Sequence, residues 1–491
     1  MSSLLDRDAG GVQLAFWAIV LAMLPGVLDQ TILATALPTI ASGLGRLSDV
    51  AWVVTAYVVA AAAAAPLWGK LGDRQGRKLM LEASLLLFLA ASAVCGAAQS
   101  LWMLVVARGI QGAAAGGLMS LAQAAVGDLV SPRERGRYQG YVMATFAVAA
   151  SVGPLLGGLL VDHASWRWVF YVNLPVGVLA LAGLHVRLPA GEAGARESRL
   201  DLAGAALLGA GTVALMLACI WGGDRYAWSS PAIVALLAGF ALAAALLVLR
   251  TRRIPDPIVP LSLIANRSVA LASTALFFVT ATMFAITVFV PLFLQTTTGA
   301  SPTQAGLLLI PMMIGITLST NVAGRLIQRT GRYKVFPIVG LGLICVALLS
   351  LAVLVQHPSR VTTGIALTLF GLGFGLVGQV LIAAVQNTVD RRQFGLAMAV
   401  TGFFRGLGGA VGAAVLGAVF AARVGATGSG SLALAHAGRV HVISGLHAVF
   451  LVAAPLAVIA LIAVLAIEEV PLRGPASSAP ARKGSAQPAT N

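Results

Sequence analysis

Charge is scarce in this sequence, and acidic side chains are the scarcer sign. Only 10% of the 491 residues are charged and 59% are hydrophobic, with 17 acidic against 32 basic side chains. A soluble globular domain carries about 25% charged residues, and the mean hydropathy here is +0.93. Such a chain has too little polar surface to cover a compact domain in water. These values exclude a soluble enzyme, a disordered protein and a secreted disulfide scaffold.

Cysteine and the motifs of several common chemistries are scarce or missing as well. Cys95, Cys219 and Cys345 all lie in apolar runs, and an odd number in such segments makes no disulfide framework. The sequence contains no Gly-x-x-x-x-Gly-Lys-Ser/Thr phosphate loop, no His-Glu-x-x-His motif and no readable Ser/His/Asp constellation. We therefore expect no ATP hydrolysis, no cofactor, no metal site and no enzymatic activity.

Long apolar runs dominate the chain instead. Each has about 20 residues or more, enough for a helix to cross a ~30 Å hydrocarbon core. Helices are required because lipid offers no partner to unpaired backbone groups. The first run is too long for a signal peptide and carries Asp29, so it predicts a retained helix. We predict an all-α membrane protein with 14 transmembrane helices. They lie near residues 14–38, 50–69, 79–98, 101–126, 138–161, 168–188, 202–221, 231–250, 269–295, 304–326, 335–356, 361–386, 395–422 and 446–467.

Basic side chains are distributed unevenly between the two sides of such a bundle. An even number of spans puts both termini on one side, and 24 of the 32 Lys and Arg residues fall there. Six fall on the opposite side, and Arg108 and Arg405 lie inside helices. The positive-inside rule therefore predicts that both termini are cytoplasmic. This bias also explains the net charge of +15 as topological, so no nucleic-acid partner is expected.

An internal repeat divides the chain. The run Gly69–Lys78 aligns with Gly324–Tyr333 at a shift of 255 residues, and further matches, such as Gly112 with Gly371, follow at a shift of 259. Parallel repeats are one of the layouts of transporters. We predict two six-helix bundles joined by two linker helices, and a disordered cytoplasmic tail. The predicted boundaries are 1–190, 191–260, 261–470 and 471–491.

Several motifs occur along the chain at defined helix positions. They are Leu28-Asp-Gln-Thr-Ile-Leu-Ala-Thr-Ala-Leu-Pro38, Gly69-Lys-Leu-Gly-Asp-Arg-Gln-Gly-Arg-Lys78, Arg108-Gly-Ile-Gln-Gly112, Gly153-Pro-Leu-Leu-Gly-Gly158 and the segment Trp166–Gly177. Together they resemble the motifs of the major facilitator superfamily, and specifically its 14-helix drug:proton antiporter family. The resemblance covers nearly the whole chain. It implies a major facilitator fold and, as the activity, export of drugs. Ala34 departs from it, because the first-helix motif usually carries Asn there.

Charged residues gather where the second helix meets the third, close to the end of the fourth. Carboxylates beside arginines at this point could form an ion-pair latch that holds one conformer. The alternative is a set of charges that only orients the chain in the membrane. The resemblance favours the latch, as a cytoplasmic gate. The residues are Gly69, Asp73, Arg74, Gly76, Arg77 and Asp128.

Glycines recur in the fifth helix. Gly153, Gly157 and Gly158, with Pro154, would let this helix bend and approach a neighbour closely. Generic packing is one interpretation. The resemblance implies the other, an antiporter motif that seals the two halves of the protein against leakage.

Three charged residues lie deep in predicted helices. The helix rise places Asp29 ~13 Å and Arg108 ~10 Å below the outer surface, so the two could pair, and Arg405 falls near mid-membrane. A charge at such depth costs at least ~2.5–3.5 kcal/mol. We favour a site for protons and substrate made of Asp29, Arg108 and Arg405. The alternatives are a purely structural ion pair and, for Arg405, bonds to backbone carbonyls.

These features predict a proton-coupled secondary transporter of the plasma membrane. It would export amphipathic small molecules, such as drugs or antibiotics, by alternating-access antiport, with protons and the lipid bilayer as its other partners. Two arginines against one aspartate in the cavity favour neutral, zwitterionic or anionic substrates. The alternative function is export of an endogenous lipid, siderophore or metabolite.

Overall fold

Helices account for the regular structure of the chain. The computed structural model describes residues 9–44, 47–130, 134–189, 201–223, 225–254, 257–258, 260–298, 304, 307–356, 359–390, 393–424 and 439–469. The predicted tail at 471–491 lies outside these residues. No strand occurs in the described ranges, so the predicted all-α fold is confirmed. In chain order the elements are α1 (Ala9–Leu44), α2 (Leu47–Gln75), α3 (Arg77–Gly96), α4 (Leu101–Leu129), α5 (Arg135–His163), α6 (Trp168–Tyr171), α7 (Asn173–Arg187), α8 (Leu202–Trp221), α9 (Pro231–Thr251), α10 (Leu261–Ala265), α11 (Arg267–Phe284), the π-helical turn η2 (Ala285–Phe289), α12 (Val290–Thr298), α14 (Ile310–Thr330), α15 (Val335–Leu354), α16 (Arg360–Thr388), α17 (Phe394–Val424) and α19 (Arg439–Leu465).

Most of these helices can cross a membrane. Among the described residues, 13 segments are long and apolar enough to do so. Two of them are composite: α6 and α7 share one, and α11, η2 and part of α12 share another. Helix α5, with 29 residues, supplies one more long helix. The predicted count of fourteen spans is therefore matched by fourteen long helical segments.

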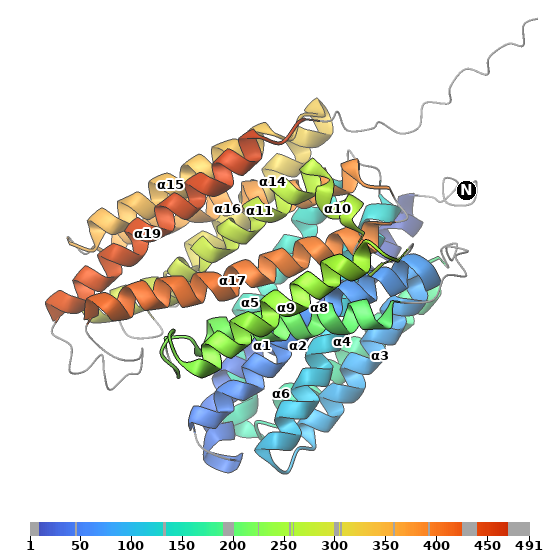
Figure 1. Cartoon of the computed structure of the whole chain (residues 1–491), viewed down its shortest axis with the longest axis horizontal. Helices are drawn as coiled ribbons and strands as arrows, with labels where there is room; N and C mark the ends of the chain where they lie inside the picture. Colours follow the sequence, from blue (N-terminus) through green and yellow to red (C-terminus); the bar gives the residue numbers. More distant parts are fainter. Residues whose placement is uncertain are drawn as a thin grey trace, which may run out of the picture.

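The helices form two sets with a pair between them. Helices α1 to α7 pack on one another, as do α11 to α19, while α8 and α9 pack together and α8 contacts α2 and α17. Figure 1 shows the first set in blue to teal and the second in green to red. We call the side where α1 begins and α2 ends the N-terminal face. The two sets meet toward this face and diverge toward the opposite face (Figure 1).

The repeat is visible in the backbone. Gly76 ends the α2–α3 turn with φ of 97°, and Gly331, which ends α14, has φ of 72°. Positive φ is costly for residues with a Cβ and free for glycine. The two glycines stand at matched positions of the repeat and both use positive φ, although their ψ angles differ, 138° at Gly76 and −6° at Gly331.

Glycines also allow α4 to lie directly against α2. A Cβ at Gly112 would overlap the backbone of Tyr57, and one at Gly116 would overlap the backbone of Ala61. Gly371, the repeat partner of Gly112, meets the backbone of Met312 in the same way. Small residues one turn apart let membrane helices approach closely. This packing holds Tyr57 of α2 directly beside the residues of α4.

We expect Gly112→Ala to destabilise the protein and Gly109→Ala to leave its stability unchanged or slightly raised. Both substitutions lie in α4 and change helix propensity equally, but a Cβ at Gly109 meets nothing within 4 Å. Overpacking costs about 1–3 kcal/mol. Thermal unfolding in detergent, followed by size-exclusion chromatography, measures the difference. Equal melting temperatures for the two variants would contradict the close α2–α4 contact.

Candidate functional site

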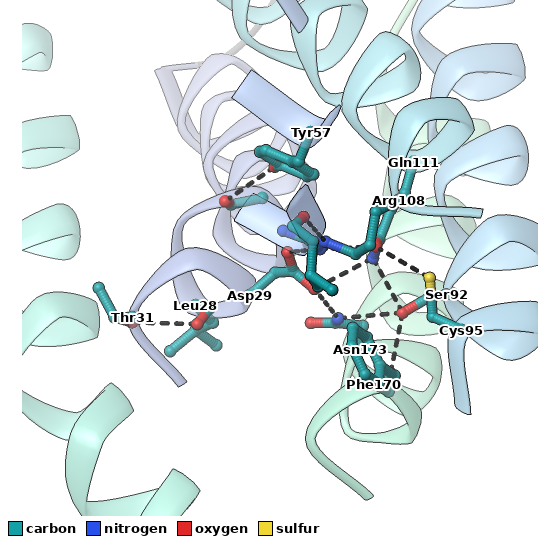
Figure 2. A network of polar contacts seen from close by, with 12 residues as sticks. Leu28, Asp29, Thr31, Tyr57, Ser92, Cys95, Arg108, Gln111, Phe170 and Asn173 are labelled. Atoms are coloured by element: carbon teal, nitrogen blue, oxygen red, sulfur yellow. Dashed lines mark hydrogen bonds and ion pairs between the residues drawn. The ribbon is translucent and has the colours of Figure 1, made fainter. Parts of the chain in front are cut away.

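Asp29 of α1 lies at the centre of a buried polar network. Its side chain is 0% exposed, and that of Arg108 in α4 is 1% exposed. Arg108 Nη1 donates a hydrogen bond to Asp29 Oδ2, and this contact is an ion pair. Gln111 Nε2 and Asn173 Nδ2 each donate to Asp29 Oδ1 at 3.1 Å. Figure 2 shows these groups of α4 and α7 converging on the carboxylate, which α1 supplies. Both carboxylate oxygens therefore already accept hydrogen bonds.

Arg108 has other partners besides the carboxylate. Its Nε donates to the carbonyl oxygen of Val53 at 3.2 Å, and Nη1 also donates to Gln111 Oε1 at 2.7 Å. The guanidinium carbon lies 4.1 Å from the centre of the Tyr57 ring, a distance at which a cation is attracted to the ring face. All these other partners are uncharged. Asp29 is therefore the one negative charge that compensates Arg108 within the described network.

Several members of this network did not emerge from the sequence as site residues. Ser92 Oγ accepts from Gln111 Nε2 and Asn173 Nδ2, both at 3.1 Å, and donates to the carbonyl oxygen of Phe170 at 2.9 Å. Gln111 and Asn173 stand inside motifs already quoted, so their presence there was the available signal. The spacing of Gln111, one turn after Arg108, also puts both on one face of α4.

A central cavity lies next to the network. It has a volume of about 480 Å³ and is lined by both helix sets and by α8. Arg405 of α17 lines it, as predicted for its depth. Asp29 and Arg108 do not, although their neighbours Gln30 and Tyr57 do. This corrects the expected cavity wall of two arginines and one aspartate: the ion pair is buried behind the wall, because Tyr57 covers the guanidinium.

The charged cluster at the N-terminal face connects the two helix sets. Arg77 Nη2 lies 3.1 Å from Asp73 Oδ1, and Arg77 Nε lies 2.5 Å from Asp128 Oδ2. Asp73 also accepts hydrogen bonds from the backbone N–H groups of Gly395 at 2.8 Å and Leu396 at 2.9 Å. A carboxylate at the first turn of a helix is stabilised by the unpaired amides and the helix dipole there. Asp73 of the first set thus caps α17 of the second.

The rest of the predicted gate residues surround this contact. A Cβ at Gly69 would lie 2.5 Å from the carbonyl oxygen of Gly395, so the glycine permits α2 and α17 to touch. Arg74 lies in the last turn of α2, and Gly76 forms the turn that follows. Phe394, which the sequence did not single out, lies beneath the guanidinium of Arg77 at 5.7 Å. The ion pairs of the expected latch are therefore formed.

The glycines of the predicted antiporter motif divide into two kinds. A Cβ at Gly153 would overlap Thr31, and one at Gly157 would overlap Thr35, so both sit against α1. A Cβ at Gly158 would meet nothing within 4 Å. Helix α5 is continuous through Pro154. The predicted close approach is present between α5 and α1, the helix that carries Asp29.

Two helix sets around a cavity, in a chain built of membrane-crossing segments, form the architecture of a secondary transporter. Comparison with known proteins agrees. The model of the Major Facilitator Superfamily matches residues 19–413. The chain therefore belongs to this superfamily of membrane transporters, as its motifs predict.

Relatives and solved structures support the same assignment. The chain is 38% identical over 405 residues to an uncharacterized MFS-type transporter of Mycobacterium tuberculosis (strain CDC 1551 / Oshkosh), a match that covers 82% of this chain and 59% of the relative. It is 35% identical over 411 residues to the multidrug transporter protein MdtP of Bacillus subtilis (strain 168), covering 83% and 75%. The crystal structure of the human organic anion transporter MFSD10 (TETRAN) has a TM-score of 0.67 at 18% identity, covering 93% of this chain and 100% of that one. This last similarity concerns the fold alone and confirms it.

We expect Arg77→Gln to open the N-terminal face, because Asp73 and Asp128 then lose the cation between them. The reporter is Gly402→Cys in a background without native cysteines, since residue 402 lines the cavity and a Cβ there meets nothing within 4 Å. A membrane-impermeant maleimide, applied from each side of sealed vesicles, should label it several-fold faster from the N-terminal face.

The matched control is Arg329→Gln, which removes an exposed arginine near the end of α14. Its labelling rate should equal that of the parent. Equal labelling of the Arg77→Gln variant and the parent from the N-terminal face would show that the ion pairs do not hold the closure.

Proposed function

We propose that this protein is a proton-coupled exporter of amphipathic small molecules that works by alternating-access antiport across the plasma membrane. The observation that carries this proposal is the buried ion pair of Asp29 and Arg108 directly behind the wall of a central cavity. A carboxylate that is shielded from water and paired with an arginine can change its protonation state when the conformation around it changes. The 14-helix drug:proton antiporter family is the branch of the superfamily that fits the chain.

The orientation follows from the basic residues. In the topology predicted from the sequence, 24 of the 32 Lys and Arg residues belong to the side on which the first helix begins, and the positive-inside rule assigns this side to the cytoplasm. The contacts of Asp73 with α17 close the cytoplasmic side, whereas the helix sets diverge on the other side (Figure 1). We therefore interpret this conformation as the outward-facing one.

In the proposed cycle, an opening of the cavity wall in front of the ion pair lets Asp29 receive a proton from outside. A proton on either oxygen replaces one of the hydrogen bonds that the carboxylate accepts from Arg108, Gln111 or Asn173. Arg108 then faces only uncharged partners. Loss of one member of a buried pair costs roughly 3–5 kcal/mol, and this penalty favours a rearrangement of α1 against α4. The rearranged, inward-facing conformer would release the proton into the cytoplasm.

Opening of the latch would produce the second conformer of the cycle, which is open to the cytoplasm. Release of Asp73 from α17, together with separation of Arg77 from Asp128, would open the cavity to the cytoplasm and admit a substrate. The close contact of Gly153 and Gly157 with α1 would let α5 follow Asp29 without leaving a leak. A charge that crosses 100 mV of membrane potential supplies about 2.3 kcal/mol, before any pH gradient. The similarity to a multidrug transporter of Bacillus subtilis supports drugs or other amphiphiles as substrates.

We expect Asp29→Asn to abolish uphill transport and to preserve downhill exchange, because Asn keeps the volume of the carboxylic acid and cannot release a proton. Proteoliposomes with an acidic interior would be offered four fluorescent amphiphiles: ethidium, and the dansyl series of dansylcadaverine, dansylglycine methyl ester and dansylglycine. For any transported probe, the initial uphill rate should fall at least tenfold while exchange between equal pH values continues.

The control acid is Asp162, which is exposed at the end of α5. Asp162→Asn should transport like wild type, and protein-free vesicles correct for passive partition of weak acids and bases. Uphill transport by Asp29→Asn at the wild-type rate would remove Asp29 from the coupling step. Absence of gradient-driven movement of all four probes with wild-type protein would reject the proposed function.

A further inference from the structure

We propose that the central cavity selects amphiphiles that carry a negative charge, and that Arg405 is the group that anchors this charge. The inference rests on the proposed function, which names amphiphiles as substrates and leaves their charge open. It is carried by the juxtaposition of a guanidinium that has no partner among the described residues with a cavity wall whose described residues include no acid.

Arg405 stands alone in the wall. It lies twelve residues into α17, so that it is far from both ends of a 31-residue helix. Across the described ranges its guanidinium makes no hydrogen bond and no ion pair, in contrast to Arg108 and Arg77. An arginine stays charged in proteins, and its planar fork of donors fits carboxylate, sulfonate and phosphate groups. The hydrogen-bond donors of this guanidinium are therefore available to a ligand.

The other polar groups of the wall are neutral. None of the described residues that line the cavity is Asp or Glu. Apart from Arg405, the polar side chains of the wall are amides and hydroxyls, among them Gln30, Gln123, Gln379 and Thr401. Asp29, the acid closest along the chain to this wall, is paired with Arg108 and is 0% exposed. A cation in the cavity therefore meets a like charge with no acid to offset it, and an anion meets its complement.

The apolar part of the wall suits a variable organic body. Four methionines line the cavity, and their unbranched, polarizable side chains adapt to ligands of different shape. They are Met119, Met143, Met216 and Met398. The volume of about 480 Å³ falls in the range of sites that bind drug-sized molecules. Gly402, one turn before Arg405 and also in the wall, leaves open space at its own position, because a Cβ there would meet nothing within 4 Å.

Binding of three dansyl probes tests this inference independently of transport. Dansylglycine, its methyl ester and dansylcadaverine share one fluorophore and carry charges of −1, 0 and +1. Their Kd values would be measured with purified protein in nanodiscs, from energy transfer between tryptophan and the dansyl group. We expect the wild-type protein to bind the anion at least tenfold more tightly than the cation, with the ester between them.

Substitutions of Arg405 identify the anchor. Arg405→Gln should weaken binding of dansylglycine at least tenfold and tighten that of dansylcadaverine, whereas Arg405→Lys should restore much of the preference for the anion. The surface variant Arg329→Gln controls for general effects of charge. Unchanged elution and melting temperature would show that the variants are folded.

The outcomes separate the two proposals. Tighter binding of the cation by wild-type protein, or an anion Kd that Arg405→Gln leaves unchanged, overturns the inference. Proton-driven transport of ethidium in that case would leave the proposed function standing. Conversely, anion binding that depends on Arg405, with no uphill transport of any probe, would support the anion site and reject proton-coupled export.

Discussion

Asp29 and Arg108 are opposite charges held together where water is excluded, and neither can change alone without a large free-energy penalty. Both side chains are almost completely buried, and leaving one member of such a pair unpaired costs roughly 3–5 kcal/mol. The surrounding amides of Gln111 and Asn173 orient the carboxylate but bring no charge. The pair therefore constrains the positions of α1, α4 and α7 relative to one another. In the proposed cycle, protonation of Asp29 relieves this constraint.

Tyr57 connects this pair to the cavity. One face of its ring lies against the guanidinium of Arg108, its hydroxyl donates to the carbonyl oxygen of Gly26 at 3.3 Å, and Tyr57 is among the residues that line the cavity. A substrate that presses on this wall would therefore act on the ion pair without touching Asp29. In the proposed antiport, competition between proton and substrate would then operate through a shared side chain instead of a shared site.

The sequence predicted the helices and the charged pair well, because hydrophobic length and helical rise are local properties. Asp29 and Arg108 fall at matching depths whichever way their helices pack. Ser92, Gln111 and Asn173 could not be assigned in this way, since neutral polar residues are frequent in helices and their meeting depends on how α1, α3, α4 and α7 pack. The expected cavity wall was wrong in part for the same reason: depth along a helix does not tell which residue faces the cavity and which lies behind it.

The two charged sites differ in how accessible they are to solvent. The pair of Asp29 and Arg108 is sealed from solvent, so its charge state can change only with a conformational opening. The latch at the N-terminal face is more accessible, but only at one point: the Asp128 side chain is 34% exposed, whereas those of Arg77 and Asp73 are 13% and 7% exposed. In the proposed cycle, water that reaches Asp128 can replace its contact with Arg77, so that the latch can be broken and remade without a prior opening of the buried pair. In the proposed cycle, the buried pair would decide which conformer is favoured, and the latch would hold the N-terminal face closed in one of them.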